Sequence, residues 1–345
     1  MSAVDPTRPV LVVGAGISGA SCARALSDAG VPVRVLDRGR RSGGRMSGRR
    51  VESAGDVRVV DLGASYFTVS GEGDLHDDFA RLVAGWQERG LARPWTDTFA
   101  VLDGSGGEPG SSSGPVRWAA PTGLRSLVED LVAQPGAAPL DVVHGIDVES
   151  VSSGEGGPGV DGRGAPAVVL AMPDPQAADL LPRMAATRLD VSARWNWRPC
   201  IAVYAGWEQR WWPDFHGAFV NDSDLLVFLA DDGSRRGDGA PVLVAHTAPD
   251  VSSEHLDAPA SVVAPVLASL GPMLGVAAAP EPTWARAHRW SLASPLRQHE
   301  DAPFGWDEES GIGVCGDAWG ERSKVQTAWE SGTALGRHLA ERFAG

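Results

Sequence analysis

The chain has 345 residues, 43% of them hydrophobic and 21% charged, a soluble globular composition with enough length for two domains. Its formal net charge of -14 disfavours nucleic acid and membranes as partners, because most of the surface would repel these polyanions. The three cysteines lie far apart without a CxxC pair, so we predict neither a disulfide framework nor a metal site and expect a reducing, cytoplasmic location.

A dinucleotide-binding unit is predicted near the N-terminus. Residues 10–13 (VLVV) are typical of a buried parallel strand, and the GAGISG turn interrupts this apolar run too early for a signal peptide or a membrane span. A helical pattern then runs to Gly30, and a second apolar strand ends at Asp37, 23 residues after Gly14, where an acid can bind a ribose hydroxyl. Glycines permit the tight turn, the close approach of a pyrophosphate and the packing of helix on strand. The candidate binding residues are Gly14, Gly16, Ser18, Gly19 and Asp37.

An arginine-rich segment follows at residues 38–50, RGRRSGGRMSGRR, in an otherwise acidic chain. With the preceding signals it resembles the FAD-binding amine oxidase superfamily, whose second fingerprint is an acid followed by a glycine pair and an arginine. The resemblance implies non-covalently bound FAD, with its diphosphate near the arginines. Arg38, Arg40, Arg49 and Arg50 either contact phosphate or lie in a solvated loop. The cofactor-binding residues that the resemblance adds here are Arg38, Gly43, Gly44, Arg45, Met46, Gly63 and Ala64.

The middle of the chain is less regular. Two glycine- and serine-rich stretches, residues 103–114 and 152–166, are expected to be flexible loops or hairpin tips. Around them, a helical pattern precedes three strand-like runs at residues 140–143, 148–151 and 168–173. In the superfamily such pieces return to the FAD lobe, and the resemblance places the backbone near Val143 against the adenine.

Residues 186–307 carry strand-like runs and eight of the thirteen tryptophans. Most of these tryptophans are expected to fill the core, and a few to stack on a planar ligand. The predicted fold is α/β (α+β), a two-lobed flavoprotein with a Rossmann-like FAD-binding domain and a sheet-based substrate domain, as in amine oxidases and p-hydroxybenzoate hydroxylase. The predicted FAD-binding domain comprises residues 1–70, 116–185 and 308–345, and the substrate domain comprises residues 71–115 and 186–307.

The C-terminal region supplies the third part of the expected FAD site. Residues 311–315 (GIGVC) form a strand-like run, a Gly-Asp pair follows, and residues 328–343 have a helical stripe. By resemblance, the Gly-Asp pair lies against the ribityl chain and pyrophosphate, and the positive helix end faces the flavin pyrimidine ring, where it favours reduction. Cys315 is interpreted as a buried strand cysteine in preference to a covalent flavin link. The candidates here are Gly316, Asp317, Gln326, Thr327 and Ala328.

A closer resemblance, covering residues 8–343 in order, is to the bacterial renalases. Its most particular segments are VLAMPDPQAADLL at residues 169–181 and AHRW at residues 287–290. Renalases are FAD oxidases that return 2- or 6-dihydro isomers of NAD(P)H to NAD(P)+, passing hydride to flavin N5 and electrons to O2, which becomes hydrogen peroxide. The resemblance implies this activity, with a dihydronicotinamide as the small-molecule substrate and O2 as the acceptor. The candidate catalytic residues are His288, Trp290 and Tyr66.

The residue chemistry agrees with hydride transfer, which needs a donor carbon stacked on the flavin and no general base. Many amine oxidases of the superfamily use a lysine bridged through water to N5, whereas the single lysine here, Lys324, lies just before the last helix. His288 either donates a hydrogen bond to a carboxamide or the flavin, or is structural. Arg235 and Arg236 either neutralise substrate phosphates or lie exposed.

Three positions depart from the renalase pattern, namely Ser291 and Leu292 after HRW, and Thr327 before the last helix. All three are expected close to where the substrate stacks. Two alternatives therefore stay open. One is a divergent flavin amine oxidase or dehydrogenase acting on another planar or amine metabolite, and the other is a non-catalytic nucleotide-binding protein of the same fold.

Overall fold

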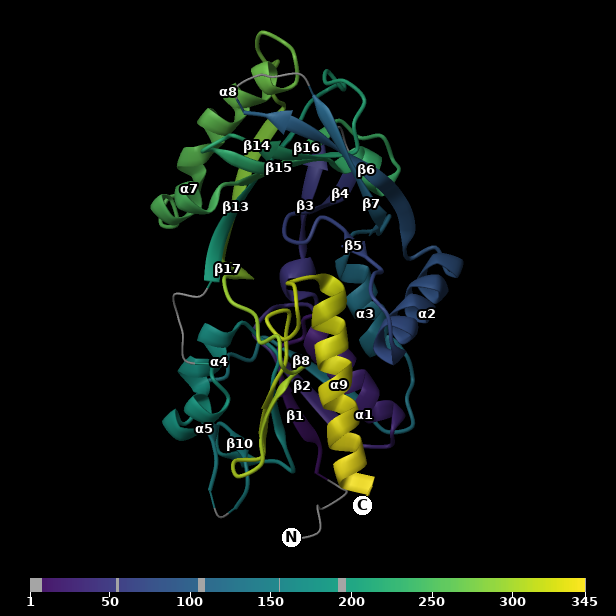
Figure 1. The fold of residues 1–345 in the computed structure, drawn as a ribbon, viewed down its shortest axis with the longest axis vertical. Helices are drawn as coiled ribbons and strands as arrows, with labels where there is room; N and C mark the ends of the chain where they lie inside the picture. The colour runs from purple at the N-terminus through teal and green to yellow at the C-terminus, as the bar shows by residue number, and fades with distance from the viewer. Residues whose placement is uncertain (1–7, 54–55, 105–108, 155, 192–196, 345) are drawn as a thin grey trace.

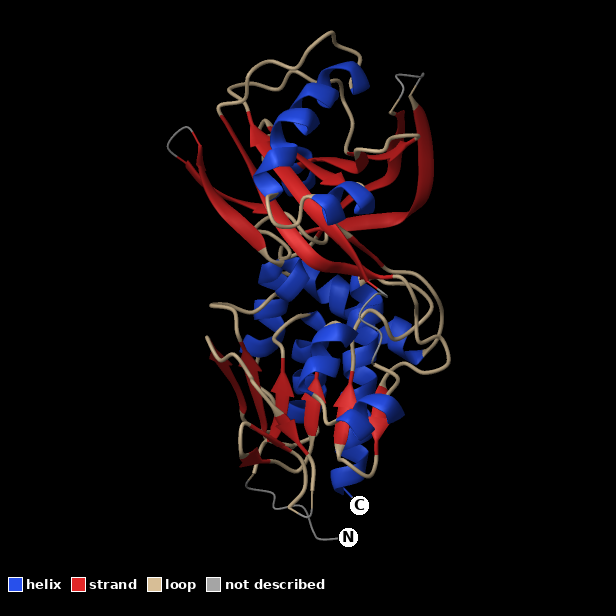
Figure 2. Ribbon diagram, turned by 90° about the vertical axis from the view of Figure 1, so that its left-hand side faces the viewer, coloured by secondary structure: helices blue, strands red, loops and turns tan. Residues whose placement is uncertain are grey.

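The computed structural model describes residues 8–53, 56–104, 109–154, 156–191 and 197–344, which form two lobes along the long axis (Figure 1). Trp195, one of the eight tryptophans counted above, lies outside the described residues. Figure 2 shows that each lobe has its own strands and that helices lie between the two sets. The architecture is therefore two-lobed and mixed α/β, which confirms the predicted fold class.

The lower lobe in Figure 1 is built on a six-stranded sheet in the order β18-β19-β12-β1-β2-β8. All neighbours in this sheet are parallel except the β18/β19 pair. The apolar run that forms β1 is fully buried, as a central strand covered on both faces requires. The strands are β1 Val10–Val13, β2 Val33–Asp37, β8 Leu140–His144, β12 Val168–Leu170, β18 Gly305–Asp307 and β19 Ile312–Val314.

Helices α1 and α9 pack closely against each other beside this sheet (Figure 1). Gly332 and Gly336 permit this close packing. A Cβ on Gly332 would come within 2.0 Å of the Ser18 carbonyl oxygen, and a Cβ on Gly336 within 2.6 Å of the Cys22 carbonyl oxygen. In the described part of the chain, none of the helices combines the length and apolar character needed to cross a bilayer. The helices of this region are α1 Ile17–Asp28, η1 Gly44–Met46, α2 Asp74–Glu88, α3 Arg125–Ala133, α4 Asp174–Leu180, α5 Arg183–Arg188 and α9 Val325–Ala344.

The upper lobe is built on an eight-stranded sheet in the order β17-β13-β16-β15-β14-β6-β7-β5, antiparallel except for the β14/β6 pair. Helix α8 covers one face, where Val266 and Leu270 share a core with Ile201 and Val203. The strands are β5 Phe67–Thr68, β6 Arg93–Asp103, β7 Gly110–Ala119, β13 Trp197–Gly206, β14 Gly217–Asn221, β15 Leu226–Asp231, β16 Val242–Thr247 and β17 Trp284–Pro295, and the helices are α6 Asp232–Arg236, α7 Pro249–Glu254, η3 Pro259–Val262 and α8 Val263–Met273.

A hairpin of β3 (Gly48–Ser53) and β4 (Asp56–Asp61) connects the two lobes. Its buried Val51 and Val60 share a hydrophobic core with Ala202 on β13 and with neighbouring residues of β16. The segment that follows the arginine-rich turn therefore packs on the upper sheet, which carries residues 62–66 to the space between the lobes.

The predicted glycine- and serine-rich stretches are partly strands. Residues 152–166 fold into the small antiparallel sheet of β9 (Val151–Ser152), β10 (Gly159–Val160) and β11 (Arg163–Gly164), consistent with hairpin tips. Residues 103–114 lie where β6 and β7 form a hairpin, consistent with the hairpin-tip alternative, but β7 already begins at Gly110, so the loop alternative was wrong for the last residues. The division into domains stays a prediction. Two features extend across its boundaries: β7 passes through the boundary at residue 116, and α2, assigned to the substrate domain, packs against α9 of the FAD-binding domain.

Candidate active site

A cavity of about 2430 Å³ lies where the turns of the lower lobe meet the inner face of the upper sheet. Its walls come from four parts of the chain: the β1–α1 turn, the arginine-rich segment with the residues after β4, the strands of the upper sheet, and the segment between β19 and α9. The sequence-predicted residues that line it are Gly14, Gly16, Ser18, Asp37, Arg38, Gly43, Gly44, Arg45, Met46, Gly63, Ala64, Tyr66, His288, Trp290, Gly316, Asp317 and Ala328.

The β1–α1 turn forms a cradle that only glycine can build. Gly14 has φ +105°, and a Cβ there would come within 2.5 Å of the Ala171 carbonyl oxygen. Gly19 lies outside the cavity and lets α1 pack on the strand, since its Cβ would meet the Gly14 carbonyl oxygen at 1.9 Å. A Cβ on Gly16 would have only the Gly44 Cα near it, at 4.0 Å, so a side chain at Gly16 would project into the cavity.

Asp37 is at the end of β2 and faces the same cradle. Its carboxylate accepts hydrogen bonds from the Ala15 N–H at 2.6 Å and the Gly39 N–H at 2.7 Å. These bonds fix the carboxylate at the edge of the turn. Each carboxylate oxygen can accept a second bond, which leaves capacity for a ribose hydroxyl.

The glycine pair Gly43–Gly44 brings Arg45 into the cavity wall. Gly43 and Gly44 have φ values of +134° and +51°, which turn the chain toward the cradle, and the Gly43 N–H donates to the Ala15 carbonyl at 2.8 Å. Arg45 then forms a two-point ion pair with Asp317, in which Nη1 lies 2.9 Å from Oδ2 and Nη2 contacts Oδ1. The same guanidinium donates to the Ala293 carbonyl at 3.0 Å.

Leu62 and Gly63 bring the residues after β4 close to the HRW segment of β17. A Cβ on Gly63 would come within 2.0 Å of the Arg45 carbonyl oxygen and 3.1 Å of the Trp290 ring. The Leu62 carbonyl accepts from the Trp290 indole N–H at 3.0 Å and also contacts the His246 Nε2 at 3.0 Å. Because a carbonyl only accepts, His246 carries its proton on Nε2.

His288 lies beside Trp290 in the cavity, with their ring centres 4.5 Å apart in a T-shaped arrangement. Arg49 Nη2 lies 3.4 Å from His288 Nδ1. Burial, and then the Arg49 and Arg289 guanidiniums, lower the pKa of His288 to about 4, so the ring is neutral near pH 7. With Nδ1 accepting from Arg49, the proton of neutral His288 is on Nε2.

Besides Gly19, three predicted residues do not line the cavity. Val143 is on β8 and packs against the hydrophobic core that contains Leu36 and Val148. Gln326 is buried and holds the Ser70 backbone with two hydrogen bonds, at 3.0 and 2.9 Å. Thr327, in the first turn of α9, donates its Oγ1 hydroxyl to the Arg322 carbonyl before the helix at 2.7 Å. Contacts of these three residues with the cofactor stay predictions.

Arg235 and Arg236 are neither exposed nor in the cavity, which corrects the sequence-based expectation. Arg235 is fully buried, contacts the Asp232 carboxylate, and donates to the Asp61 and Ser65 carbonyls at 3.1 and 3.2 Å. The pair is on the short helix α6, which follows β15 and packs against β15 and β16. The Arg235 charge therefore supports the cavity wall from behind.

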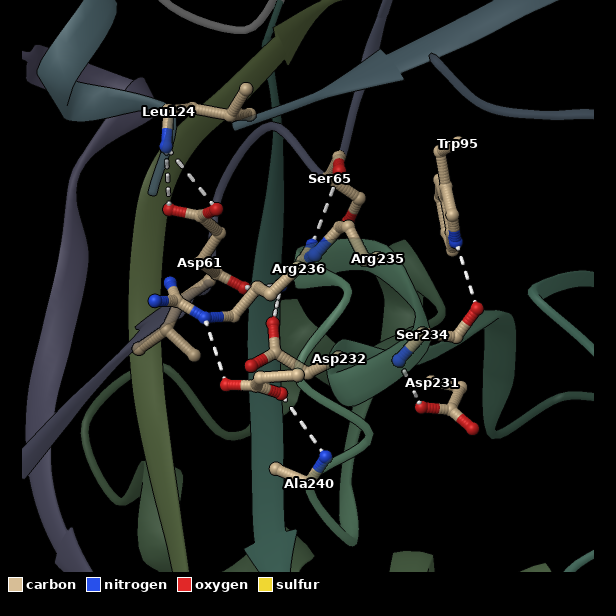
Figure 3. A network of polar contacts seen from close by, with 12 residues as sticks. Asp61, Ser65, Trp95, Leu124, Asp231, Asp232, Ser234, Arg235, Arg236 and Ala240 are labelled. Atoms are coloured by element: carbon tan, nitrogen blue, oxygen red, sulfur yellow. Dashed lines mark hydrogen bonds and ion pairs between the residues drawn. The ribbon is translucent and has the colours of Figure 1, made fainter. Parts of the chain in front are cut away.

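Asp61 is buried beside this pair, and its carboxylate accepts from the Leu124 N–H at 3.1 and 3.2 Å (Figure 3). Burial raises the pKa of Asp61 to about 6, an effect that the nearby Arg235 charge partly offsets.

Sequence reasoning missed His246 and Cys200, which both line the cavity from adjacent strands. A histidine in the otherwise apolar VLVAHT run was a usable signal, since a polar side chain in such a strand needs a partner. Burial lowers the pKa of His246 to about 4 and raises the pKa of Cys200 to about 12. Both side chains are therefore neutral near pH 7.

Lys324 and Cys315 differ in their relation to the cavity. Lys324 lines it, with Nζ 3.1 Å from the Ser70 hydroxyl, at the start of α9. Cys315 is fully buried in the sheet core, outside the lining, and burial raises the pKa of its thiol to about 12. The buried interpretation of Cys315 is confirmed.

The cavity is strongly cationic. Among the described residues its lining contains eleven arginines and one lysine against five carboxylates, in a chain whose formal net charge is -14. The lining therefore collects positive charge that the rest of the surface lacks, and it favours an anionic occupant.

A Rossmann-like lobe with a glycine cradle, facing a sheet lobe across an arginine-lined cavity, defines a dinucleotide-dependent oxidoreductase with a separate substrate lobe. The profile of the NAD(P)-binding Rossmann-like domain matches residues 12–82. The profile of the flavin containing amine oxidoreductases matches residues 96–335. The chain belongs to the flavin containing amine oxidoreductase family.

Solved structures of similar fold agree with this class. A protein assigned as a protoporphyrinogen oxidase from Exiguobacterium sp. 255-15 has a TM-score of 0.73 and 15% identity, over 97% of this chain and 99% of that chain. Cyclohexylamine oxidase from Brevibacterium oxydans IH-35A has a TM-score of 0.71 and 14% identity, over 99% and 100%. A triple mutant of putrescine oxidase has a TM-score of 0.70 and 18% identity, over 97% and 99%. At these identities the likeness concerns the fold alone.

The enzyme is an FAD-dependent oxidoreductase, and its residues fit the cofactor. The open space at Gly16 suits a pyrophosphate, and the first turn of α1 offers backbone N–H groups to it. FAD is held without a covalent link, and Cys315 lies outside the cavity. Bound FAD supplies the hydride-accepting chemistry, which the protein tunes and shields.

Proposed function

We propose that this enzyme oxidises dihydronicotinamide dinucleotide isomers, the renalase-like activity that its sequence resembles. The surplus of guanidinium groups in the cavity carries this proposal, because it exceeds what the diphosphate of FAD alone would neutralise. Arg49, Arg50 and Arg198 are exposed in the lining and have no carboxylate partner among the described residues. A second dinucleotide would supply the matching negative charge.

The protonation states of the lining support hydride transfer. When bound, FAD would supply the hydride-accepting chemistry, so that the substrate would leave as NAD(P)+ and O2 would take up the two electrons with protons to give hydrogen peroxide. The donor carbon loses no proton, so the protein needs only to orient the ring and exclude water. His288 can direct its Nε2–H to a carboxamide oxygen, because Arg49 occupies Nδ1. Trp290 and Tyr66 offer aromatic walls for a planar ring.

Oxidation of an amine is the second candidate, favoured by the family that the chain belongs to. Simple alkylamines are cations near pH 7, and such a substrate would meet the guanidinium surplus of the cavity. Lys324 is hydrogen-bonded to Ser70 at the start of α9, on the lower lobe. Cavity charge therefore favours the dihydronicotinamide over an amine.

The proposal is tested by mixing FAD-saturated enzyme, without oxygen, with the isomer mixture made by borohydride reduction of NAD+. Rapid bleaching of the flavin absorbance that returns when air is admitted is the expected result. Putrescine and cyclohexylamine are the comparison substrates. Bleaching by an amine with none by the dinucleotide mixture would overturn the proposal in favour of the second candidate.

A charge variant sharpens the test. The double substitution Arg49→Met with Arg198→Met should raise the KM for the dihydro isomers about tenfold or more, the effect of losing charge-assisted phosphate contacts. Arg163→Met, on β11 and outside the cavity, is the matched control and should leave KM unchanged. Equal KM values in the double variant and the control would contradict phosphate recognition by this pair.

A further inference from the structure

Arg117 is a buried arginine in the cavity wall without a carboxylate partner among the described residues. It is on β7, its side chain is 6% exposed, and it lines the cavity beside Tyr66. Its guanidinium lies over aromatic rings, 4.0 Å from the ring centre of Phe99, 5.8 Å from Tyr66 and 6.0 Å from Phe219. One donor, Nη1, reaches the Asp97 carbonyl at 2.6 Å.

A guanidinium so placed is incompletely neutralised. Burying a charge is costly unless it is paired, and no carboxylate lies within ion-pair distance of Arg117 among the described residues. The aromatic faces stabilise the cation without accepting its remaining N–H groups. By contrast, the buried Arg235 on the same lobe contacts the Asp232 carboxylate directly. The difference places an unneutralised, partly desolvated cation in the cavity wall.

We propose that Arg117 is an anion-binding residue for substrate, receiving an oxyanion, either a phosphate or a carboxylate. The planar fork of arginine matches two oxygens of either group, and the aromatic surroundings strengthen the charge interaction by excluding water. Under the proposed function, on which this inference builds, the oxyanion is a phosphate of the dinucleotide other than those that Arg49 and Arg198 contact. The sheet order separates β7 from β17 by five strands, so the anion site lies across the sheet from His288. An elongated substrate with its reactive ring and its anion at opposite ends fits this arrangement.

The test titrates oxidised, FAD-loaded enzyme at low ionic strength with two probes, inorganic pyrophosphate and benzoate. Binding is followed by the difference spectrum of the flavin and by the rise in Tm. Arg117→Met should weaken binding of the preferred probe about 10- to 100-fold, the effect of losing a charge-assisted hydrogen-bonding pair. Arg117→Lys, which keeps the charge but loses the fork, should fall between. Arg163→Met should bind as the wild type does.

The two probes distinguish the sources of the oxyanion, since pyrophosphate reports a phosphate group and benzoate an aromatic carboxylate. Wild-type affinity for both probes in flavin-loaded Arg117→Met would overturn the proposal, as would failure of the wild type to bind either. If Arg117→Met does not retain flavin, the Kd of Arg117→Lys for the probes is compared with that of the wild type. Weaker binding then supports the proposal, and equal binding overturns it. The binding test needs no turnover. If Arg117→Met loses probe binding and dihydronicotinamides do not bleach the flavin of the wild type, the anion site stands and only the proposed substrate is rejected.

Discussion

Arg45 and Asp317 form a two-point ion pair across a sequence separation of 272 residues. Arg45 follows Gly43 and Gly44, and Asp317 follows β19. Their ion pair therefore joins two of the segments that line the cofactor part of the cavity. Asp317 is 5% exposed, and the Arg45 side chain is also partly shielded. The pair therefore fixes the relative position of two cofactor-binding turns.

Asp317→Asn should weaken FAD binding about tenfold or more, because it removes the charge that holds Arg45 and leaves a partly buried guanidinium without its partner. Flavin content of the purified protein and the Kd from quenching of FAD fluorescence would measure this. Asp214→Asn is the control, since it removes a surface ion pair with Arg210 at 2.6 Å. Equal FAD affinity in the two variants would contradict a role for the Arg45–Asp317 pair in the cofactor site.

Gly16→Val should yield mostly apoprotein that is still folded. The side chain would enter the space above the β1–α1 turn, where the backbone must approach a pyrophosphate, and would clash with little else in the protein. Absorbance near 450 nm relative to 280 nm and the far-ultraviolet circular dichroism would be compared. Gly85→Val, in the middle of α2 and with its Cβ only 3.8 Å from the tip of Arg89, is the matched control. Normal flavin content in Gly16→Val would refute the position assigned to the pyrophosphate.

His288→Ala should slow flavin reduction by substrate roughly two- to tenfold while leaving FAD content normal, the cost of one lost hydrogen bond. In the wild type the reduction rate should be constant between pH 8 and pH 5.5 and fall as the pH approaches 4. In that range His288 gains a proton on Nδ1, which then repels Arg49. Stopped-flow absorbance across this pH range would measure both effects, with His255→Ala as control. A rate and pH profile unchanged by His288→Ala would make the residue purely structural.

His246 should make folding pH-dependent. Its pKa is about 4 in the folded protein and 6.5 when unfolded, so between these values the unfolded chain binds more protons. The stability from His246 is therefore complete above pH 6.5 and is lost as the pH falls toward 4, by at most about 3 kcal/mol. Urea unfolding of the wild type minus that of His246→Gln would isolate this contribution, because titration of Asp61 cancels in the difference. A difference that does not change with pH would contradict burial of a neutral His246.

Local sequence signals predicted the cofactor lobe well. The β1–α1 turn, Asp37 and the Gly43–Gly44 pair each depend on contiguous residues whose backbone needs are visible in the sequence. The same signals placed Gly16 and Asp37 in one cavity, as the structure has them.

The misjudged residues are those whose environment depends on sheet pairing. Arg235 and Arg236 have the sequence of an exposed turn, yet α6 packs behind residues 61–65 and buries both. His246 and Arg117 enter the cavity because β16 and β7 turn one face of the upper sheet toward it. Each of these strands pairs with the strand just before it, β15 or β6, and also with a more distant strand, β13 or β5, and a single sequence carries no record of the register of the distant pairing.

The Leu62 carbonyl, which accepts from both His246 on β16 and Trp290 on β17, engages two strands of the upper lobe at a single atom. Both lone pairs of that oxygen are occupied by side chains that leave their own strand ladders intact. Leu62 is itself buried in one core with Ala202 of β13 and Val244 of β16, so this oxygen ties the segment after β4 to the upper sheet as one packed unit. A displacement of the upper sheet would therefore carry the cavity wall at residues 62–66 with it.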